Sequence, residues 1–433
     1  MAGGTWTSQN KVQPGVYINT RSRGNLGVSI GEKGVVAIAE PLSWGPSGVI
    51  QEIIPGEDLK PFTGYDVTSP KTLFLREMMK GSDSTPGPIK ILLYRPAGSG
   101  GAKAAATVDG LTATARYEGI RGNDITVIVQ ADPDKGDVFD VVTVIDGSAA
   151  DEQEVKTIEE LKENAWVKFT GTGAPAETAG QALEGGKDPE VSPSDYAQFL
   201  TVLEPYTFDI LVYDGTDSAT MQAMASFVKR VSENVGLKCQ AVMAGAETSN
   251  SEWVISVNNG VKLSDGTELS PQQATWWLGG AEAGARYNES LTYARYPDAI
   301  EAFPKKKDTE ISEAIQKGEV VFIDNFGTVK VCTDINTLTS FSVDKGQEYS
   351  KNRVMRVLNQ FCNDVYRQFS LYYIGKVDNN ESGRGLLKGW IVGYLNEMQA
   401  NGGIQNFVAD DVTVQVGNSV DSRWRVASAG GCH

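Results

Sequence analysis

The chain has 433 residues and a formal net charge of −16 at pH 7, with 40% hydrophobic and 22% charged residues. This length exceeds that of an ordinary single domain, so we expect several domains with a sizeable core, and the acidic balance argues against a nucleic-acid-binding surface, which phosphates would avoid. The only histidine, His433, and four scattered cysteines exclude histidine-based triads and give no sign of a zinc site or a disulfide framework.

Residues 1–25 are polar and rich in glycine, asparagine, serine and threonine, which predicts a flexible extended arm. No apolar run in the chain reaches the roughly 18 residues that span a bilayer, and the N-terminus lacks the apolar core of a signal peptide, so we expect folding in the cytoplasm. One alternating stretch of the arm predicts a single strand, with a disordered tail as the alternative. Its residues are Val12, Pro14, Gly15, Val16, Tyr17 and Ile18.

Residues 26–97 and 188–318 are predicted to form one α/β domain. Apolar runs bounded by turn residues predict four of its strands, at residues 35–39, 89–94, 208–213 and 237–243. Serine-proline pairs at 69–70, 192–193 and 270–271 predict helix starts, because serine caps a helix and proline suits its first turn. Strands and helices in this order indicate right-handed βαβ units.

Residues 98–187 interrupt that order with a strand-rich block. Alternating apolar residues predict its strands, at residues 111–118, 124–130 and 138–145. Glycine-rich segments on both sides, 98–101 and 171–186, indicate flexible linkers. We therefore predict an inserted β-rich domain, facing outward because insertions are tolerated where few contacts are disturbed.

Residues 319–433 are predicted to form a C-terminal assembly domain. A strand at 320–323 precedes Val329 and Val331, which alternate as in a hairpin partner. Apolar residues at helical spacing predict a first helix, with the face Val354, Val357, Leu358, Phe361, Val365 and Tyr372. A second helix follows, with the face Leu386, Leu387, Trp390, Ile391, Tyr394, Leu395 and Met398.

The alternating residues Val412, Val414 and Val416 predict a terminal strand without a sequence-adjacent partner. Such a strand must pair with something. The chain as a whole thus reads as an α/β and α+β multidomain protein, with an α/β core, an inserted strand-rich domain, a C-terminal hairpin-plus-helices domain and a flexible N-terminal arm.

Three segments have some features of reaction or ligand sites. Residues 98–103 are glycine-rich but lack the phosphate-loop pattern, which favours a linker. Residues 132–137 begin like a calcium loop yet lack its closing glutamate, which favours a hairpin turn. Residues 214–217 follow a strand at the edge where α/β sheets bind ligands, but helix capping by Asp217 explains them more simply. We predict no catalytic residue, no metal and no cofactor.

Five segments are informative through their order and spacing, at residues 14–18, 115–125, 183–188, 318–333 and 383–407. Together they resemble the tail sheath proteins of contractile phage tails and of related phage-like bacteriocins, in the form found in Gram-positive bacteria.

The resemblance implies a non-enzymatic subunit that stacks in six-membered rings around a tail tube and contracts to drive the tube through a cell envelope. It implies neighbouring copies, the tube protein, baseplate proteins and a tail terminator as partners, and a place in a virion or particle tail assembled in the bacterial cytoplasm. No nucleic acid and no membrane insertion are implied.

Rings of this family are joined by strands that neighbouring subunits exchange. We therefore expect interface residues in the arm, in the predicted hairpin and in the terminal strand, namely Val12, Pro14, Gly15, Val16, Tyr17, Ile18, Val329, Val331, Val412, Val414 and Val416.

One departure from the family concerns the C-terminus. Members usually continue beyond the equivalent of Ser422 with a β-rich segment, whereas residues 423–433 alternate weakly. This suggests that residues 412–416 are the last native strand, that the exchange strand is missing and that the chain polymerises poorly. The alternatives are an α/β enzyme with an inserted β domain and, less well supported because no export signal or anchor is visible, an adhesion protein.

Overall fold

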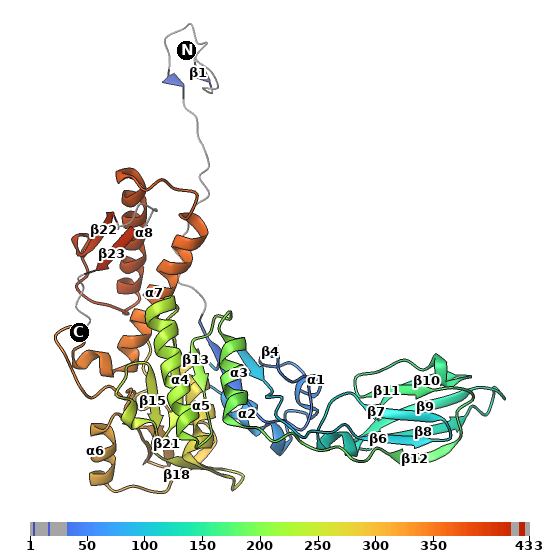
Figure 1. Ribbon diagram of the computed structural model, residues 1–433. Coiled ribbons are helices and arrows are strands. Elements are labelled where there is room, and N and C mark those ends of the chain that lie inside the picture. The colour runs from blue at the N-terminus through green and yellow to red at the C-terminus, as the bar shows by residue number, and fades with distance from the viewer. Residues whose placement is uncertain (1–2, 5–15, 18–32, 417–423, 429–433) are drawn as a thin grey trace. The chain divides into compact units, whose positions relative to one another are not determined.

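The computed structural model describes residues 3–4, 16–17, 33–416 and 424–428 (Figure 1). The chain divides into two compact units. Of the described residues, the larger unit holds 33–374 and the smaller unit holds 3–4, 16–17, 375–416 and 424–428. Among the residues described, none of the helices combines the length and the apolar character needed to cross a membrane.

The larger unit is organised around a seven-stranded sheet in the order β19-β15-β14-β13-β3-β5-β4. All neighbours pair in parallel except β4, which runs antiparallel to β5. The strands are β3 Val35–Ala39, β4 Ile50–Ile53, β5 Lys90–Tyr94, β13 Ile210–Val212, β14 Gln240–Ala244, β15 Val254–Val257 and β19 Glu319–Val320. The predicted strands and their βαβ order are confirmed.

Helices cover both faces of this sheet. Ile38 and Val212 point to one face, into a core shared with α2 Leu73–Met79 and α5 Pro271–Gly284. Ala37 and Leu211 point to the other face, toward α3 Pro193–Leu203 and α4 Ser218–Arg230, which lie side by side in Figure 1. Because both faces are buried, the central strands β3 and β13 are apolar along their whole length rather than alternating.

The predicted serine caps are in place. Ser192 and Ser270 each form a capping box with the residue three positions later, and proline follows each of them. Ser69 caps the short helix η1 Pro70–Thr72, and the carboxylate of Asp217 accepts a hydrogen bond from the Thr220 amide at 2.8 Å. Two further short α-helices are α1 Lys60–Thr63 and α6 Asp308–Gln316.

The inserted block is a β-sandwich, which confirms the predicted strand-rich insertion. Its two sheets have the orders β10-β9-β8-β12 and β11-β7-β6. The strands are β6 Ala105–Val108, β7 Leu111–Ala115, β8 Thr126–Ala131, β9 Phe139–Ile145, β10 Ser148–Val155, β11 Val167–Gly171 and β12 Thr178–Ala182. Alternate residues such as Val127, Val141 and Val167 meet in the core between the sheets.

The connections to the sandwich differ from the flexible linkers expected. Ser99 and Glu190 exchange two backbone hydrogen bonds, of 3.0 and 2.8 Å, and Ala102 and Lys187 exchange two more, each of 3.0 Å. The outgoing and returning segments therefore form a short antiparallel ladder. The sequence could not show this, because the pairing joins residues about 90 positions apart.

The stretch from 320 to 331 belongs to the larger unit. Val320 completes β19 of the central sheet, and the hairpin that follows consists of β20 Phe322–Asn325 and β21 Thr328–Val331. A further small sheet is formed by β16 Gly260–Leu263, β17 Glu268–Leu269 and β18 Ala299–Phe303. The predicted single strand at 320–323 is thus split between two sheets.

The helix α7 Asn352–Tyr372 has a different buried face from the one predicted. Of the predicted apolar face only Val357 is fully buried, while Tyr372 is 45% exposed. The buried positions include Arg356, Asn359 and Asp364. The apolar spacing thus identified only part of the buried face. Leu358 packs against the core, and polar residues with partners elsewhere in the fold make up much of the rest.

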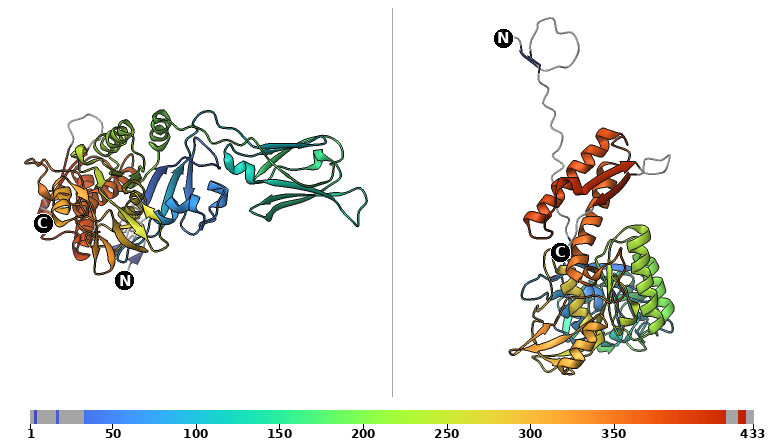
Figure 2. Two further views of the ribbon diagram at one scale, coloured as in Figure 1. Left: turned by 90° about the horizontal axis from the view of Figure 1, so that it is seen from below. Right: turned by 90° about the vertical axis from the view of Figure 1, so that its left-hand side faces the viewer.

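The smaller unit contains α8 Glu381–Ala400 and the hairpin of β22 Val412–Val416 and β23 Trp424–Ser428. Figure 2, in its right-hand view, shows this hairpin lying along α8. The strand pair β1 Gly3–Gly4 and β2 Val16–Tyr17 is also described, and its strands are parallel.

Candidate assembly surface

The C-terminal hairpin rests on α8 in the smaller unit. The helix begins where the side chain of Asn380 accepts a hydrogen bond from the Gly383 amide at 2.8 Å. Its inner face is the predicted one except for Leu386, which is 47% exposed. Val412 of β22 is completely buried, and α8 and β22 are in contact. The hairpin therefore has one face fixed to the helix.

The pairing of β22 corrects the predicted end of the chain. Val412 pairs with Ser428, Val414 with Val426, and Val416 with Trp424, in an antiparallel ladder. The expectation that residues 412–416 form the last strand and lack a sequence-adjacent partner is therefore wrong. Residues 424–428 alternate too weakly in hydrophobicity for the sequence alone to predict a strand. They form one because they pair with β22.

The hairpin is a candidate for strand addition because its sheet is narrow. Within the described residues this sheet contains β22 and β23 only, so each strand has an outer edge with no strand beside it. An unpaired edge is a template for a further strand. The side chains of Thr413 and Gln415 are exposed and that of Val414 is half-buried, so β22 is amphipathic.

The predicted interface residues fall into three groups. Val12, Pro14, Gly15 and Ile18 lie outside the described residues, whereas Val16 and Tyr17 form β2 beside Gly3 and Gly4. Val412, Val414 and Val416 lie together on β22.

Val329 and Val331 have no exposed surface, so this part of the predicted interface is wrong for the folded subunit. Both side chains lie in the main core. The outer edge of β21 is also occupied, because Val329 accepts a hydrogen bond from the Tyr296 amide at 3.0 Å and the amide of Val331 donates one to Ala294 at 3.0 Å. Residues of the same subunit therefore occupy the outer edge of β21.

A buried charge cluster in the larger unit was not predicted. Arg356 of α7 donates hydrogen bonds to the carboxylates of Glu282 on α5 and Asp334, and to the Glu289 carbonyl at 2.9 Å. Both ion pairs are 1% exposed. In the sequence, the only sign of this cluster is a charged residue, Arg356, among apolar helix positions. That sign does not identify the partners of Arg356.

The pKa values in this cluster move apart. Burial, together with the neighbouring Asp334, raises the pKa of Glu282 well above its usual range. Burial acts to raise the pKa of Asp334 as well, but Arg356 and hydrogen bonds outweigh it and the pKa of Asp334 is lowered. The two shifts favour a protonated Glu282 beside an ionised Asp334. Arg356 binds both carboxyl groups through its terminal nitrogens, whereas its Nε has no hydrogen-bond partner among the described residues. This arrangement joins α7 to α5 and offers no exposed group for a reaction.

The segment that resembled a calcium loop is the turn between β8 and β9, as the hairpin reading predicted. Asp132, Asp140 and Glu154 are the one group of three carboxylates within the described residues close enough to share an ion. Lys135 already binds two of them, with its Nζ 3.2 Å from Asp132 and 2.5 Å from Glu154. Because this lysine balances part of the negative charge of the cluster, a salt-bridged turn explains the three carboxylates without a metal ion.

Four family models match the chain in sequence. They are the tail sheath protein Gp18 domain III N-terminal region at 33–85, the phage tail sheath beta-sandwich domain at 99–188, the central domain at 190–337 and the C-terminal domain at 344–427. The phage-like element PBSX protein XkdK of Bacillus subtilis is 34% identical over 97% of this chain and 95% of its own length. The chain belongs to the contractile phage tail sheath family.

Solved sheath structures agree with this assignment. The sheath tail protein of Desulfitobacterium hafniense is 39% identical, covers 96% of this chain and all of its own, and has a TM-score of 0.86. The sheath tail protein of Listeria innocua is 32% identical, with coverages of 92% and 96% and a TM-score of 0.78. The contracted helical sheath of the anti-feeding prophage shares the fold at 13% identity and a TM-score of 0.56, with coverages of 97% and 96%.

This sheath protein is a structural, non-enzymatic chain, and the alternative of an α/β enzyme finds no support. The model of the beta-sandwich domain, at 99–188, covers the inserted sandwich of the fold.

Proposed function

We propose that the chain polymerises as stacked six-membered rings around a tail tube and that the resulting sheath contracts to drive the tube through a cell envelope. Its partners are neighbouring copies of itself, the tube protein, the baseplate and the tail terminator. The observation that carries the proposal is the two-stranded β22–β23 ladder, which has unpaired outer edges among the described residues and lies in a matched sheath C-terminal domain.

Strand addition supplies a physical mechanism for joining rings. A strand from a neighbour's arm, centred on Val16 and Tyr17, adds to an outer edge of β22 or β23. Each backbone hydrogen bond contributes only about 0.5–1.5 kcal/mol. Several such bonds per subunit, repeated around every ring, give a stable lattice through avidity.

The geometry of this contact favours a tube. A strand that one subunit donates and the next receives is a head-to-tail contact, and such contacts build open helical assemblies unless they close into a ring. Rings joined through extended segments can slide and widen without separating. Contraction is then a rearrangement between two packings of nearly rigid subunits. The anti-feeding prophage sheath, which shares the fold, is a helical sheath in the contracted state.

The earlier suggestion that the exchange strand is missing loses its basis. Residues 424–428 form β23, and the matched C-terminal domain extends to residue 427. We therefore propose that the chain polymerises, in contrast to the poor polymerisation inferred from the sequence.

Sedimentation and negative-stain microscopy of the full chain test this proposal. Wild-type protein is expected to form tubes, and a variant lacking residues 1–25 is expected to remain monomeric. Val16→Pro removes a backbone donor from the arm strand and should also block tubes, whereas Val16→Thr keeps a β-branched residue and serves as the matched control. Tubes of normal length from the deletion variant would refute exchange through the arm.

A further inference from the structure

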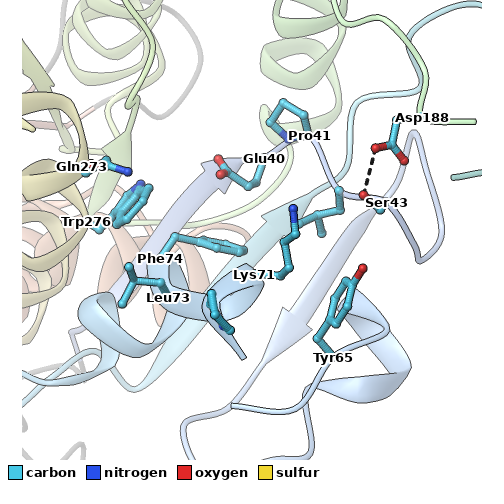
Figure 3. A pocket seen from close by; sticks show the side chains of 12 residues that line it. Glu40, Pro41, Ser43, Tyr65, Lys71, Leu73, Phe74, Asp188, Gln273 and Trp276 are labelled. Atoms are coloured by element: carbon cyan, nitrogen blue, oxygen red, sulfur yellow. Dashed lines mark hydrogen bonds between the residues drawn. The ribbon is translucent and has the colours of Figure 1, made fainter. Parts of the chain in front are cut away.

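A cavity of about 310 Å³ lies at the carboxyl edge of the central sheet, and it plays no part in the proposed assembly (Figure 3). Glu40, the residue after β3, lies on one side, and Gln273 and Trp276 of α5 lie opposite. In Figure 3 the carboxylate of Glu40 extends toward these two residues, near the ring of Phe74. The exposed side chain of Lys71 lines the cavity as well.

The sheet topology explains why the cavity lies there. From β3 the chain continues to β4 and then β5, both on one side of β3, whereas β13 lies on the other side. The gap between β3 and β13 is therefore a topological switch point, where open α/β sheets leave a crevice beyond the carboxyl ends of their strands. The register pairs Ile38 with Val212, so Glu40 and Asp214 follow side by side two residues later.

These two carboxyl groups differ in their hydrogen-bond partners. The Trp276 Nε1 donates a hydrogen bond to Asp214 at 2.8 Å. The Oε2 atom of Glu40 is buried and accepts no hydrogen bond from the described part of the chain. A buried carboxyl oxygen without a donor costs about 1–3 kcal/mol, so it indicates either a proton or a ligand.

Burial, and then the neighbouring Asp214, raise the pKa of Glu40 well above its usual range. Burial likewise raises the pKa of Asp214, although Trp276 acts to lower it. Both shifts favour the protonated form of these carboxyl groups. Tyr196 of α3 faces both groups, and burial followed by these carboxylates raises its pKa, so it stays neutral.

The charged groups nearby do not neutralise the pair. Asp188 is held by the Ser43 hydroxyl at 3.0 Å and the Ile120 amide at 2.9 Å. Arg95, one strand away, donates to three backbone carbonyls. Lys71 forms no ion pair with Glu40 or Asp214 among the described residues. The carboxyl pair thus lacks a cation of its own.

We propose that this cavity binds an organic cation, with its ammonium or amidinium-type head on Glu40, which lines the cavity and has Asp214 beside it, and its apolar part against Trp276 and Phe74. Aromatic walls attract such cations. A divalent metal is a poorer fit, because these two residues are not part of a three-carboxylate cluster among the described residues.

Binding exchanges one positive charge for another. The incoming cation pairs with the carboxylates, and the proton they share leaves to the buffer. Affinity should therefore rise as the pH rises, and proton release should accompany binding.

Benzamidine, an arginine side-chain mimic, and its neutral analogue benzamide are the probes. Calorimetry on the full chain under non-polymerising conditions, in two buffers of different ionisation enthalpy, measures affinity and protons released. We expect benzamidine to bind at least ten times more tightly than benzamide and to release up to one proton. Glu40→Gln should weaken benzamidine binding at least tenfold and abolish the proton release, whereas Glu152→Gln, an exposed carboxylate on the sandwich, should change neither.

Asp214→Asn gives a second reading if the first variant folds poorly, and it should also weaken binding. Equal binding of both probes, or unchanged binding and proton release in a folded Glu40→Gln or Asp214→Asn variant, would overturn the proposal. A comparison of polymerised and monomeric protein distinguishes two sources of the cation. Loss of benzamidine binding on polymerisation indicates a basic side chain of a second copy, and retained binding indicates a small soluble cation.

Discussion

Arg356→Met is the most direct perturbation of the larger unit. It removes two buried charge-assisted hydrogen bonds, to Glu282 and Asp334, and the bond to the Glu289 carbonyl. Charge-assisted bonds contribute about 1.5–3 kcal/mol each, but the change also relieves the guanidinium of its desolvation. Breaking a buried pair from one side costs about 3–5 kcal/mol, because the remaining charge is left unpaired. We expect a loss of that size in the free energy of unfolding of the larger unit.

Urea denaturation followed by tryptophan fluorescence measures this loss, since Trp276 and Trp277 lie on the same helix as Glu282. Arg356→Lys, which keeps the charge but not the forked geometry, should lose less. Adding Asp334→Asn to Arg356→Met removes the orphaned charge, so the double variant should be more stable than the sum of the single effects predicts. A loss below about 1 kcal/mol for Arg356→Met, or simple additivity, would refute this account.

The pKa of Asp334 is lowered in the folded chain, so the ionised carboxylate stabilises the fold at pH values above the ordinary carboxyl pKa. This stabilisation is lost as the pH falls through the lowered pKa, so the stability of Asp334→Asn should depend less steeply on pH in acid. Gly280→Ala should destabilise strongly in thermal melts, because its Cβ would lie 1.9 Å from the Met78 carbonyl oxygen, whereas Gly389→Ala on α8, with open space around it, should be neutral or stabilise by up to about 1 kcal/mol. Burial raises the pKa of Cys239 to about 12, so a thiol reagent at pH 8 should label it only after unfolding in a chain whose other cysteines are serine; rapid native labelling would contradict its burial. Finally, the net charge of −16 predicts slower polymerisation at low salt, measurable by light scattering, because copies repel one another over longer distances.

The sequence was informative where local chemistry determines local structure. Strands buried on both faces are apolar along their length, and serine-proline pairs mark helix starts, so β3, β13, α3 and α5 could be placed. It was uninformative where pairing joins distant residues. Three contacts show this limit: Val320 pairs within the central sheet, Trp424 pairs with Val416, and Arg356 binds Glu282. Spacing along the chain reveals none of these partners.

The same limit applies to the candidate surface. Val412, Val414 and Val416 could be recognised as a strand, but its partner β23 could not, because residues 424–428 have weak periodicity. Val329 and Val331 have the alternation of an exposed hairpin edge, yet residues 294–296 cover that edge from within the subunit.

Electron cryomicroscopy of tubes formed by the full chain tests the central proposal most directly. We predict six subunits per ring, with a strand of one subunit's arm added to the outer edge of β22 or β23 of a neighbour. Tubes in which both edges stay unpaired, or a chain that remains monomeric with its arm paired to its own hairpin, would contradict it.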